Sequence, residues 1–326
     1  MKVAVTGAAG FVGVNLLHEL VGAGHEVVAL DRTTSSLAPD QGVTWVEADV
    51  LDTDSVIQAI DGAEVVYHLV AMITLRQEDP LAWRVNTEGV GNVADAALTV
   101  GARKLVHCSS IHSFDNRGIE VLDETSQRSH EDCGLPVYDR SKYAGELELS
   151  KYIDKGLDAV ICNPTGIYGG IDVPGRLSRL NTLARDAAKG RVPLSIGGAF
   201  DLVDVRDVAK GLTLAAEHGR TGENYLLSGE MVALHDLMKL AARSAGRRGP
   251  LFAVPLWVVK AIMPIAEPLG ALFGSDVMSE AALGALFASP TVDDSKARTD
   301  LGYDPRPFEE TVRDVVSWFV RASLLG

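Results

Sequence analysis

The sequence predicts an α/β protein built on a doubly wound parallel sheet, and two observations lead to that prediction. The first is the alternation of short runs rich in β-branched residues with longer helical patterns through the first half of the 326-residue chain. The second is that the short runs are apolar without interruption, as expected for strands that helices cover on both faces. Sheets of this kind bind ligands at the carboxyl ends of their strands, so functional residues are expected there.

The predicted elements follow one another along the chain. Six runs are the expected strands, KVAVT, EVVAL, VTWVEA, EVVYHL, KLVHC and DAVICN, and apolar spacing predicts helices over 11–21, 53–60, 81–100 and 138–155. A helix over 205–218 and the strand NYLLS are expected to return the chain to the sheet. The remainder is expected to be helical with irregular connections and to end in an amphipathic helix over 308–322.

Composition narrows the partners that the chain is expected to have. A formal net charge of −14 argues against a nucleic-acid backbone as partner, because that partner requires a basic face. Three cysteines form neither a disulfide framework nor a paired metal-ligand spacing, as expected of reduced thiols in an intracellular protein. The amino-terminal segment reaches glycine after a very short apolar run and is not expected to be a secretory signal. We therefore expect a cytoplasmic protein that acts on a small molecule and holds no metal.

One stretch, residues 251–274, is apolar enough to suggest a membrane span. Three prolines and two charged residues interrupt it, whereas a span needs about 20 predominantly apolar residues. An integral span is therefore not expected. The favoured interpretation is a pair of ordinary buried helices, and the alternative is the wall of a pocket for an apolar substrate.

Three glycines, Gly7, Gly10 and Gly13, lie between the first predicted strand and the first predicted helix. Glycine permits a tight turn and lets backbone N–H groups approach a pyrophosphate, which then lies at the positive end of a helix. Asp31 ends the second predicted strand, where a carboxylate binds the ribose hydroxyls of a dinucleotide. The same carboxylate repels the 2′-phosphate of NADP, so NAD is the expected cofactor, while Arg32 keeps NADP as an alternative.

These features together predict a Rossmann fold. The predicted dinucleotide-binding domain comprises residues 1–165 plus about 201–228. The predicted substrate-binding domain is smaller and discontinuous, and it comprises about 166–200 and 229–326.

Tyr138 and Lys142 lie four residues apart in a predicted helix, so both side chains can face one site. A phenol with a pKa of about 10 is a poor base at neutral pH. We expect the Lys142 ammonium and a positive nicotinamide ring to favour the phenolate and lower that pKa. Ser110 follows the strand KLVHC at the carboxyl edge of the sheet and is expected to hydrogen-bond the reacting oxygen. The three residues predict proton transfer beside a nicotinamide.

Five features of the chain occur in the order TGAAGFVG, the strand-end Asp31, Ser110, the Tyr138–Lys142 pair and NPTGIYG. In these features the chain resembles the extended short-chain dehydrogenases/reductases, the NAD-dependent epimerase/dehydratase family. The resemblance runs from residue 1 to about residue 322. It implies that Lys142 also holds the nicotinamide ribose and that the helices at 81–100 and 138–155 form a homodimer. It also implies further cofactor contacts, namely Phe11 and Val12 in the glycine loop, Asp49 and Val50 near the adenine, Leu69, Val70 and Ala71 at a strand end, the supporting Asn86, and Asn163, Pro164 and Thr165 beside the nicotinamide.

Departures from the family's motifs narrow the reaction. Sugar-nucleotide 4,6-dehydratases resemble one another in an Asp-Glu pair where this chain has Ile111 and His112. Nucleotide-sugar epimerases usually carry an arginine that binds the substrate diphosphate, in a segment that is shorter here and lacks that residue, although Arg176, Arg179 or Arg206 could replace it. The match is closer to the dihydroflavonol-reductase and 3β-hydroxysteroid-dehydrogenase branches, and to sugar epimerases linked with hopanoids.

Three functions are consistent with these motifs. The leading hypothesis is an oxidoreductase that interconverts a secondary alcohol and a ketone by hydride transfer. The second is an epimerase with tightly bound NAD, and the third is a non-catalytic dinucleotide sensor. His112 is interpreted as a solvated loop residue, and Asp201, Asp204 and Asp207 as structural residues, because no partner His or Cys set accompanies them.

Overall fold

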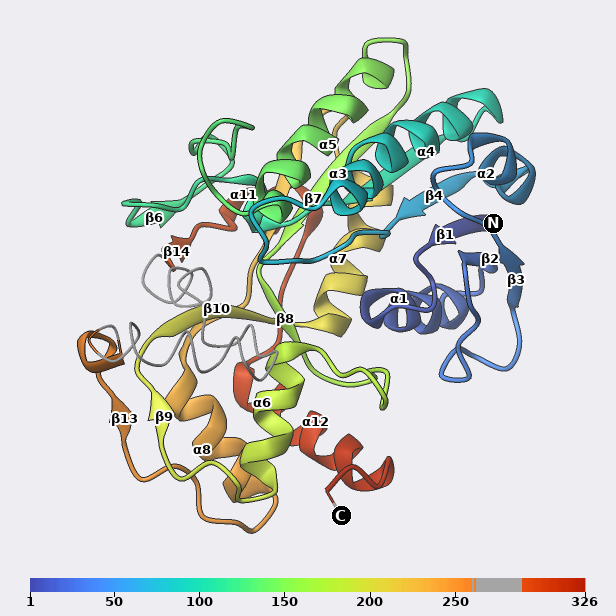
Figure 1. Ribbon diagram of the computed structural model, residues 1–326. Coiled ribbons are helices and arrows are strands. Elements are labelled where there is room, and N and C mark those ends of the chain that lie inside the picture. Colours follow the sequence, from blue (N-terminus) through green and yellow to red (C-terminus); the bar gives the residue numbers. More distant parts are fainter. Residues whose placement is uncertain (260, 262–288, 326) are drawn as a thin grey trace.

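Seven parallel strands form the central sheet of the computed structural model, which describes residues 1–259, 261 and 289–325 (Figure 1). Their order across the sheet is β11-β7-β5-β4-β1-β2-β3. The strands are β1 Lys2–Thr6, β2 Glu26–Asp31, β3 Val43–Glu47, β4 Val65–His68, β5 Lys104–Cys108, β7 Ala159–Pro164 and β11 Asn224–Leu227. The chain leaves β1 toward β2 in one direction and returns to β4 on the other side, so the order reverses between β1 and β4. The predicted doubly wound parallel sheet is confirmed.

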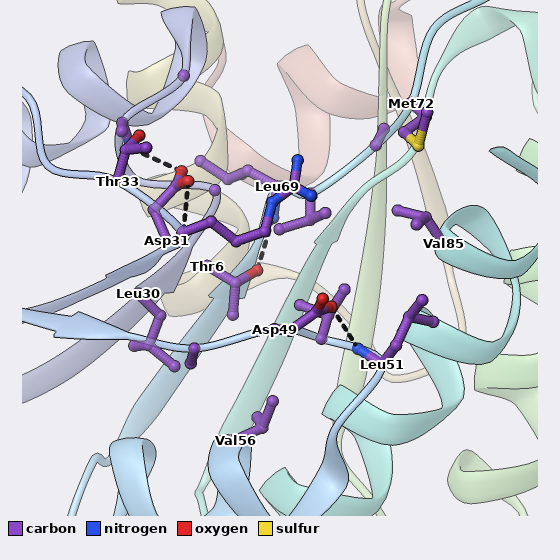
Figure 2. Close-up of a pocket in the computed structure, with 18 of the residues that line it drawn as sticks. Thr6, Leu30, Asp31, Thr33, Asp49, Leu51, Val56, Leu69, Met72 and Val85 are labelled. Carbon is purple, nitrogen blue, oxygen red and sulfur yellow. Dashed lines mark hydrogen bonds between the residues drawn. The ribbon is translucent and has the colours of Figure 1, made fainter. Parts of the chain in front are cut away.

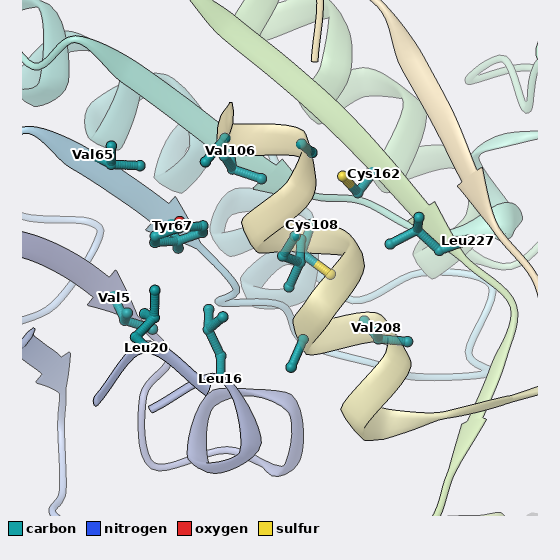
Figure 3. Packing of buried hydrophobic residues seen from close by; sticks show 14 of the residues in the cluster. Val5, Leu16, Leu20, Val65, Tyr67, Val106, Cys108, Cys162, Val208 and Leu227 are labelled. Carbon is teal, nitrogen blue, oxygen red and sulfur yellow. The ribbon is translucent and has the colours of Figure 1, made fainter. Parts of the chain in front are cut away.

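Helices cover both faces of this sheet. One face carries α1 Phe11–Gly22, α7 Val205–His218 and α11 Ser295–Leu301, and the other carries α2 Thr53–Ile60, α3 Pro80–Asn86, α4 Glu88–Thr99 and α5 Val137–Ile153. Figure 3 shows the first interface, where Leu16 and Leu20 of α1 and Val208 of α7 pack onto side chains of the strands. Cys108 and Cys162 are buried in this layer, as the apolar strand pattern predicted.

The helix expected over 81–100 is two helices, because the chain bends at Thr87. Thr87 ends α3 and precedes α4 with φ −118° and ψ −72°, and its hydroxyl donates to the Trp83 carbonyl. Asn86, just before the bend, hydrogen-bonds the backbone of Met72 through its amide. The single-helix prediction was wrong because this long-range contact has no local sequence signal.

The remaining strands and helices lie beside the central sheet and form smaller sheets and a second helical core. Strands β8 Gly166–Tyr168, β10 Ala199–Asp204 and β12 Glu230–Ala233 pair into a three-stranded sheet, and helices α6 Arg179–Ala188, α8 Leu234–Ser244 and α12 Phe308–Arg321 share a core of their own. Short pairs join β9 Ser195–Ile196 to β13 Ala253–Val254 and β6 Val121–Leu122 to β14 Thr291–Val292, and one 3₁₀ turn spans Ile111–Ser113. The helical expectation after residue 229 was therefore incomplete, since it omitted β12, β13 and β14.

The apolar stretch at 251–274 begins differently from the favoured interpretation. Leu251 is 78% exposed, Phe252 57% and Trp257 73%, so its first part is not buried. Residues 260 and 262–274 lie outside the described residues. Within the described part of the chain, no helix is long and apolar enough to cross a bilayer.

Two buried histidines stack in the centre of the sheet. The ring centroids of His68 in β4 and His107 in β5 are 5.3 Å apart, and His68 Nδ1 lies 2.7 Å from the Thr6 hydroxyl. Burial lowers the pKa of His68 to about 3 and the pKa of His107 well below its usual range, and the charge of Lys142 acts in the same direction. Both imidazoles are therefore neutral in the folded protein at neutral pH.

This stack is expected to make the protein less stable in mild acid. An unfolded histidine has a pKa of about 6.5, so below that pH the unfolded chain binds protons that the folded chain excludes. The stabilisation is complete above pH 6.5 and is lost as the pH falls toward the folded values, by roughly 2 kcal/mol per histidine at pH 5. Urea unfolding above pH 6.5 and at pH 5 measures this loss of free energy of unfolding. A His107→Leu variant should lose less free energy of unfolding on acidification than the wild type, and an equal loss would contradict the assignment.

Candidate active site

A cavity of about 330 Å³ opens at the carboxyl edge of the sheet, where the strand order reverses between β1 and β4. Figure 2 shows Asp31 at the end of β2, Leu69 and Met72 after β4, and Val85 of α3 around this space. Crevices at such reversal points are where parallel α/β sheets bind nucleotides. Of the residues predicted to contact the cofactor, those lining the cavity are Gly7, Gly10, Asp31, Arg32, Asp49, Val50, Leu69, Val70 and Ala71.

The glycine loop lines this cavity, and at two of its positions there is no room for a side chain. Gly7 has φ +73°, and a Cβ there would lie 3.0 Å from the Val70 backbone nitrogen. A Cβ on Gly13 would lie 2.3 Å from the Gly7 carbonyl oxygen, so only glycine lets α1 start against the loop. Phe11, Val12 and Gly13 do not line the cavity, and Val12 packs instead against the core.

Asp31 joins the end of β2 to the glycine loop. Its Oδ2 accepts a hydrogen bond from the Ala9 N–H at 3.0 Å, and its Oδ1 accepts one from the Arg32 N–H at 2.7 Å. The carboxylate is therefore fixed at the cavity wall. Asp49, on the next segment, accepts from the Leu51 N–H at 2.9 Å.

Several lining residues were not predicted from the sequence. They are Thr6, Ala9, Leu30, Thr33, Ala48, Leu51, Val56, Met72, Leu81 and Val85. Most are apolar neighbours of predicted positions, which the spacing of the motif could have indicated. Arg176, considered above as an anion ligand, also lines the cavity: it precedes α6, far along the chain, and brings a positive charge there. Of the other arginines considered as anion ligands, Arg206 is held by Asp204 and Asp314.

Ser110, Tyr138 and Lys142 converge at the end of β5. The Tyr138 phenol lies beside the Ser110 hydroxyl, which favours the ionised form of the phenol, and Lys142 Nζ donates to the Cys108 carbonyl at 3.1 Å. All three side chains are buried. They do not line the cavity described above, but Asn86 connects the two regions through hydrogen bonds to the Met72 backbone and the Ser141 hydroxyl.

Burial dominates the ionisation of the pair within the chain itself. It raises the pKa of the Tyr138 phenol, and the nearby Ser110 hydroxyl only partly opposes this increase. Burial also lowers the pKa of Lys142, while Cys108 and Glu146 favour its charged form. The lowering of the Tyr138 pKa that we expect from Lys142 together with a positive nicotinamide ring stays a prediction, and it has to overcome this desolvation.

A buried network fixes the backbone around Ser110. Asn163 donates through Nδ2 to the Ser110 carbonyl at 3.1 Å and to Glu146 Oε1 at 2.9 Å. Glu146 also accepts from the Ser109 hydroxyl at 2.5 Å and pairs with Arg128. Pro164 and Thr165 follow Asn163 at the end of β7, outside the cavity lining. Glu146 was not predicted from the sequence, because a glutamate inside an amphipathic helix normally faces solvent.

His112 lies beside Tyr138, with ring centroids 5.5 Å apart. Its backbone N–H donates to the Ser110 hydroxyl at 3.2 Å, and its Nδ1 lies 2.8 Å from Asp139 Oδ1. Burial acts to lower the pKa of His112, but the charge of Asp139 and its hydrogen bond raise it overall. The residue interpreted as a solvated loop histidine is thus tied to the candidate catalytic group.

Comparisons with known proteins agree with this geometry. The model of the NAD dependent epimerase/dehydratase family matches residues 3–228. Sterol demethylase protein B of Methylococcus capsulatus is 30% identical over 325 residues, which span 98% of each protein. A 3 beta-hydroxysteroid dehydrogenase/Delta 5→4-isomerase of Mycobacterium tuberculosis is 26% identical over 93% of this chain and 86% of its own length. The crystal structure of gox2253 matches with a TM-score of 0.83 and 29% identity, over 98% of both chains.

The matches to sterol demethylase protein B and to gox2253 span 98% of this chain. Residues 3–228, which the family model matches, include the elements that carry the Ser110–Tyr138–Lys142 group. The chain is therefore an NAD-dependent enzyme of the extended short-chain dehydrogenase/reductase type and belongs to the NAD dependent epimerase/dehydratase family.

Proposed function

We propose that the enzyme interconverts a secondary alcohol and a ketone. The observation that supports this reaction most directly is the convergence of Ser110, Tyr138 and Lys142 at the end of β5, next to the glycine-loop cavity. The cavity fits a dinucleotide because added Cβ atoms at Gly7 and Gly13 would crowd the surrounding backbone, and because Asp31 is fixed at its wall. When bound, NAD supplies the hydride acceptor or donor and, in its oxidised form, a positive ring.

Each residue of the group has a distinct task in this proposal. The Ser110 hydroxyl hydrogen-bonds the substrate oxygen and orients it toward Tyr138. Tyr138 removes the hydroxyl proton during oxidation and returns it during reduction. Lys142 and the positive ring favour the phenolate against the upward shift that burial imposes, and Lys142 also holds the nicotinamide ribose. Asn163, Pro164 and Thr165 border the ring, while Phe11 and Val12 support the pyrophosphate loop.

The proposed substrate is a bulky, largely apolar alcohol or ketone. The names of the two relatives, a sterol demethylase protein and a hydroxysteroid dehydrogenase, support this class. We infer that the substrate binds between the dinucleotide-binding part, 1–165 and about 201–228, and the substrate-binding part, 166–200 and 229–326. The positive charge of Arg179 in α6 acts to lower the pKa of His112, which supports a site that both parts border.

Turnover with a panel of alcohols tests the reaction. Full-length protein with NAD and a sterol alcohol is expected to accumulate NADH, whereas a sugar nucleotide should give none. Isomerised sugar nucleotide with NAD retained and no NADH would favour the epimerase, the second candidate, for which Arg176 at the cavity is the supporting observation. Binding of NAD without turnover of any substrate would favour a sensor.

We also propose that the protein is a cytoplasmic homodimer. The helices expected to form the interface, α3 to α5, pack together, and they leave Leu81 49% exposed and Leu147 46% exposed. Light scattering coupled to gel filtration measures the mass in solution. A monomeric mass at all concentrations would contradict the dimer without affecting the proposed reaction.

The preference for NAD over NADP is expected to depend on Asp31. Replacing Asp31 by Asn removes the negative charge and keeps the shape, so the KM for NAD should rise by roughly tenfold and the discrimination against NADP should fall. Steady-state kinetics with both cofactors measures this change. Asp49→Asn, a charge-matched control on the same cavity wall, should affect the choice between cofactors much less, and equal effects would contradict the role of Asp31.

A further inference from the structure

A surface with unusual composition lies at the β9–β13 end of the molecule, away from β1, β2 and β3 (Figure 1). Four large apolar side chains there are exposed, namely Leu194, Leu251, Phe252 and Trp257. Isolated exposed apolar residues are ordinary, but a group of this size marks an interaction site. The name basic–apolar patch is used below for these four residues together with six basic residues, Lys189, Arg191, Lys239, Arg243, Arg247 and Arg248.

The apolar members come together through backbone pairing. The Leu251 N–H donates to the Pro193 carbonyl at 2.9 Å, and the Ser195 N–H donates to the Phe252 carbonyl at 3.2 Å. The segments before β9 and before β13 therefore run side by side, which brings Leu194 near Leu251 and Phe252. Trp257 follows two residues after Pro255, just beyond β13.

The charge of this region is opposite to that of the chain. Segments 187–200 and 237–259 contain no Asp or Glu, in a protein with 44 acidic residues, and they contain six basic residues, Lys189, Arg191, Lys239, Arg243, Arg247 and Arg248. Among the described residues, none of the six takes part in an ion pair, and the four arginines are exposed. In the part of the chain that the structure describes, the acids that border these segments are Asp186, which pairs with Arg185, Asp236 at the start of α8, and Asp201, which is buried.

The two segments also meet through their basic residues. The Arg247 side chain passes within 4 Å of the position that a Cβ on Gly190 would occupy, and Gly249 packs against Lys239 of α8. Gly190 and Gly249 lie a few residues from the paired segments that carry Leu194, Leu251 and Phe252, so Arg247 and Lys239 belong to the same part of the molecule as these apolar residues. Exposed aromatic and aliphatic side chains beside exposed arginines match the two layers of a membrane interface, because the apolar groups enter the acyl boundary while the guanidinium groups reach anionic headgroups.

We propose that the basic–apolar patch binds the surface of a membrane that contains anionic phospholipid. The net charge of −14 would repel such a surface, so binding depends on the local patch. At physiological ionic strength screening acts over about 8 Å, which lets the patch interact while distant acidic residues contribute little. A peripheral location would place the enzyme where lipid-soluble substrates are concentrated. The proposal holds for any reaction that the active site catalyses.

Vesicle binding by the full-length protein tests the proposal. It should sediment with vesicles of phosphatidylcholine and phosphatidylglycerol, less with phosphatidylcholine alone, and less again in high salt. The fluorescence of Trp257 should shift to shorter wavelength on binding, and brominated lipid should quench it. Trp257 is 73% exposed whereas Trp45 and Trp83 are partly buried and Trp318 is 8% exposed, so the shift should disappear in Trp257→Ser.

Two double variants separate the contributions of charge and apolar area. Arg247→Glu/Arg248→Glu should reduce partitioning to anionic vesicles at least about thirtyfold. Phe252→Ser/Trp257→Ser should reduce it on both kinds of vesicle. The matched controls are Arg103→Glu/Lys155→Glu, two exposed basic residues beside the central sheet, and Val121→Ser, which is 55% exposed. Neither control should change partitioning, and circular dichroism and Tm verify that all variants fold.

Three results would overturn the proposal. The first is no sedimentation with anionic vesicles at low salt. The second is an equal loss of binding in the charge-matched control, which would show general electrostatics rather than a patch. The third is concentration-dependent self-association that Phe252→Ser/Trp257→Ser abolishes while vesicles have no effect, because the patch would then be a contact between two copies of the chain. Each of these three results would leave the proposed alcohol–ketone reaction unaffected, since NADH production measures that reaction separately.

Discussion

Replacing Tyr138 by Phe is expected to lower the turnover number by roughly 10²- to 10⁴-fold, the usual contribution of a positioned general acid or base. The change removes one hydroxyl group, which lies beside the Ser110 hydroxyl. The ring keeps its buried place beside His112, so the fold and the glycine-loop cavity should be unaffected. The affinity for NAD, measured by calorimetry, should therefore change little while kcat falls.

A second tyrosine on the same helix is the matched control. Tyr143 lies five residues further along α5, and its ring packs against His130 and Arg128, away from Ser110. Tyr143→Phe should keep nearly full turnover. Unchanged turnover in Tyr138→Phe, or an equal loss in both variants, would contradict the assignment of Tyr138 as the proton-transfer residue.

Much of the region around the cofactor was predictable from the sequence, because local rules determine it. The turn at Gly7, the close contact at Gly13 and the strand-end position of Asp31 each follow from what one residue type permits at one point of a βαβ unit. The continuous apolar runs also predicted the buried parallel strands. These features depend on residues within about one strand–helix unit of one another, so the order of residues carries the information.

Features that depend on distant segments were not predictable in this way. The bend at Thr87 arises where Asn86 binds the loop at Met72, and Arg176 reaches the cavity from another part of the chain. The exposure of Phe252 and Trp257 was also missed, because hydropathy alone does not distinguish a buried apolar segment from a surface one. The burial that raises the pKa of the Tyr138 phenol was also not predicted, since the extent of burial is a tertiary property.

Removing the negative charge of Glu146 is expected to lower the free energy of unfolding by about 3–5 kcal/mol, because it leaves Arg128 without its buried partner. The side chains of Glu146 and Arg128 are only 5% and 16% exposed. The Glu146 carboxylate also accepts from Ser109 and Asn163 on one oxygen and from Asn224 on the other. Glu146→Gln keeps the size of the side chain but exchanges one acceptor oxygen for a donor, so at least one of these bonds is lost. Urea unfolding measures the effect.

Glu148, on the same helix, provides the control. It pairs with Lys151, but the two side chains are 37% and 60% exposed, so Glu148→Gln should cost no more than about 1 kcal/mol. If both variants lose the same free energy of unfolding, burial does not strengthen the ion pair between Glu146 and Arg128. Because Asn163 bonds both Glu146 and the Ser110 carbonyl, Glu146→Gln should also lower kcat, whereas Glu148→Gln should not. If Glu146→Gln lowers the stability but not kcat, the role of Glu146 is structural only. Asn163 would then hold the Ser110 carbonyl without help from Glu146.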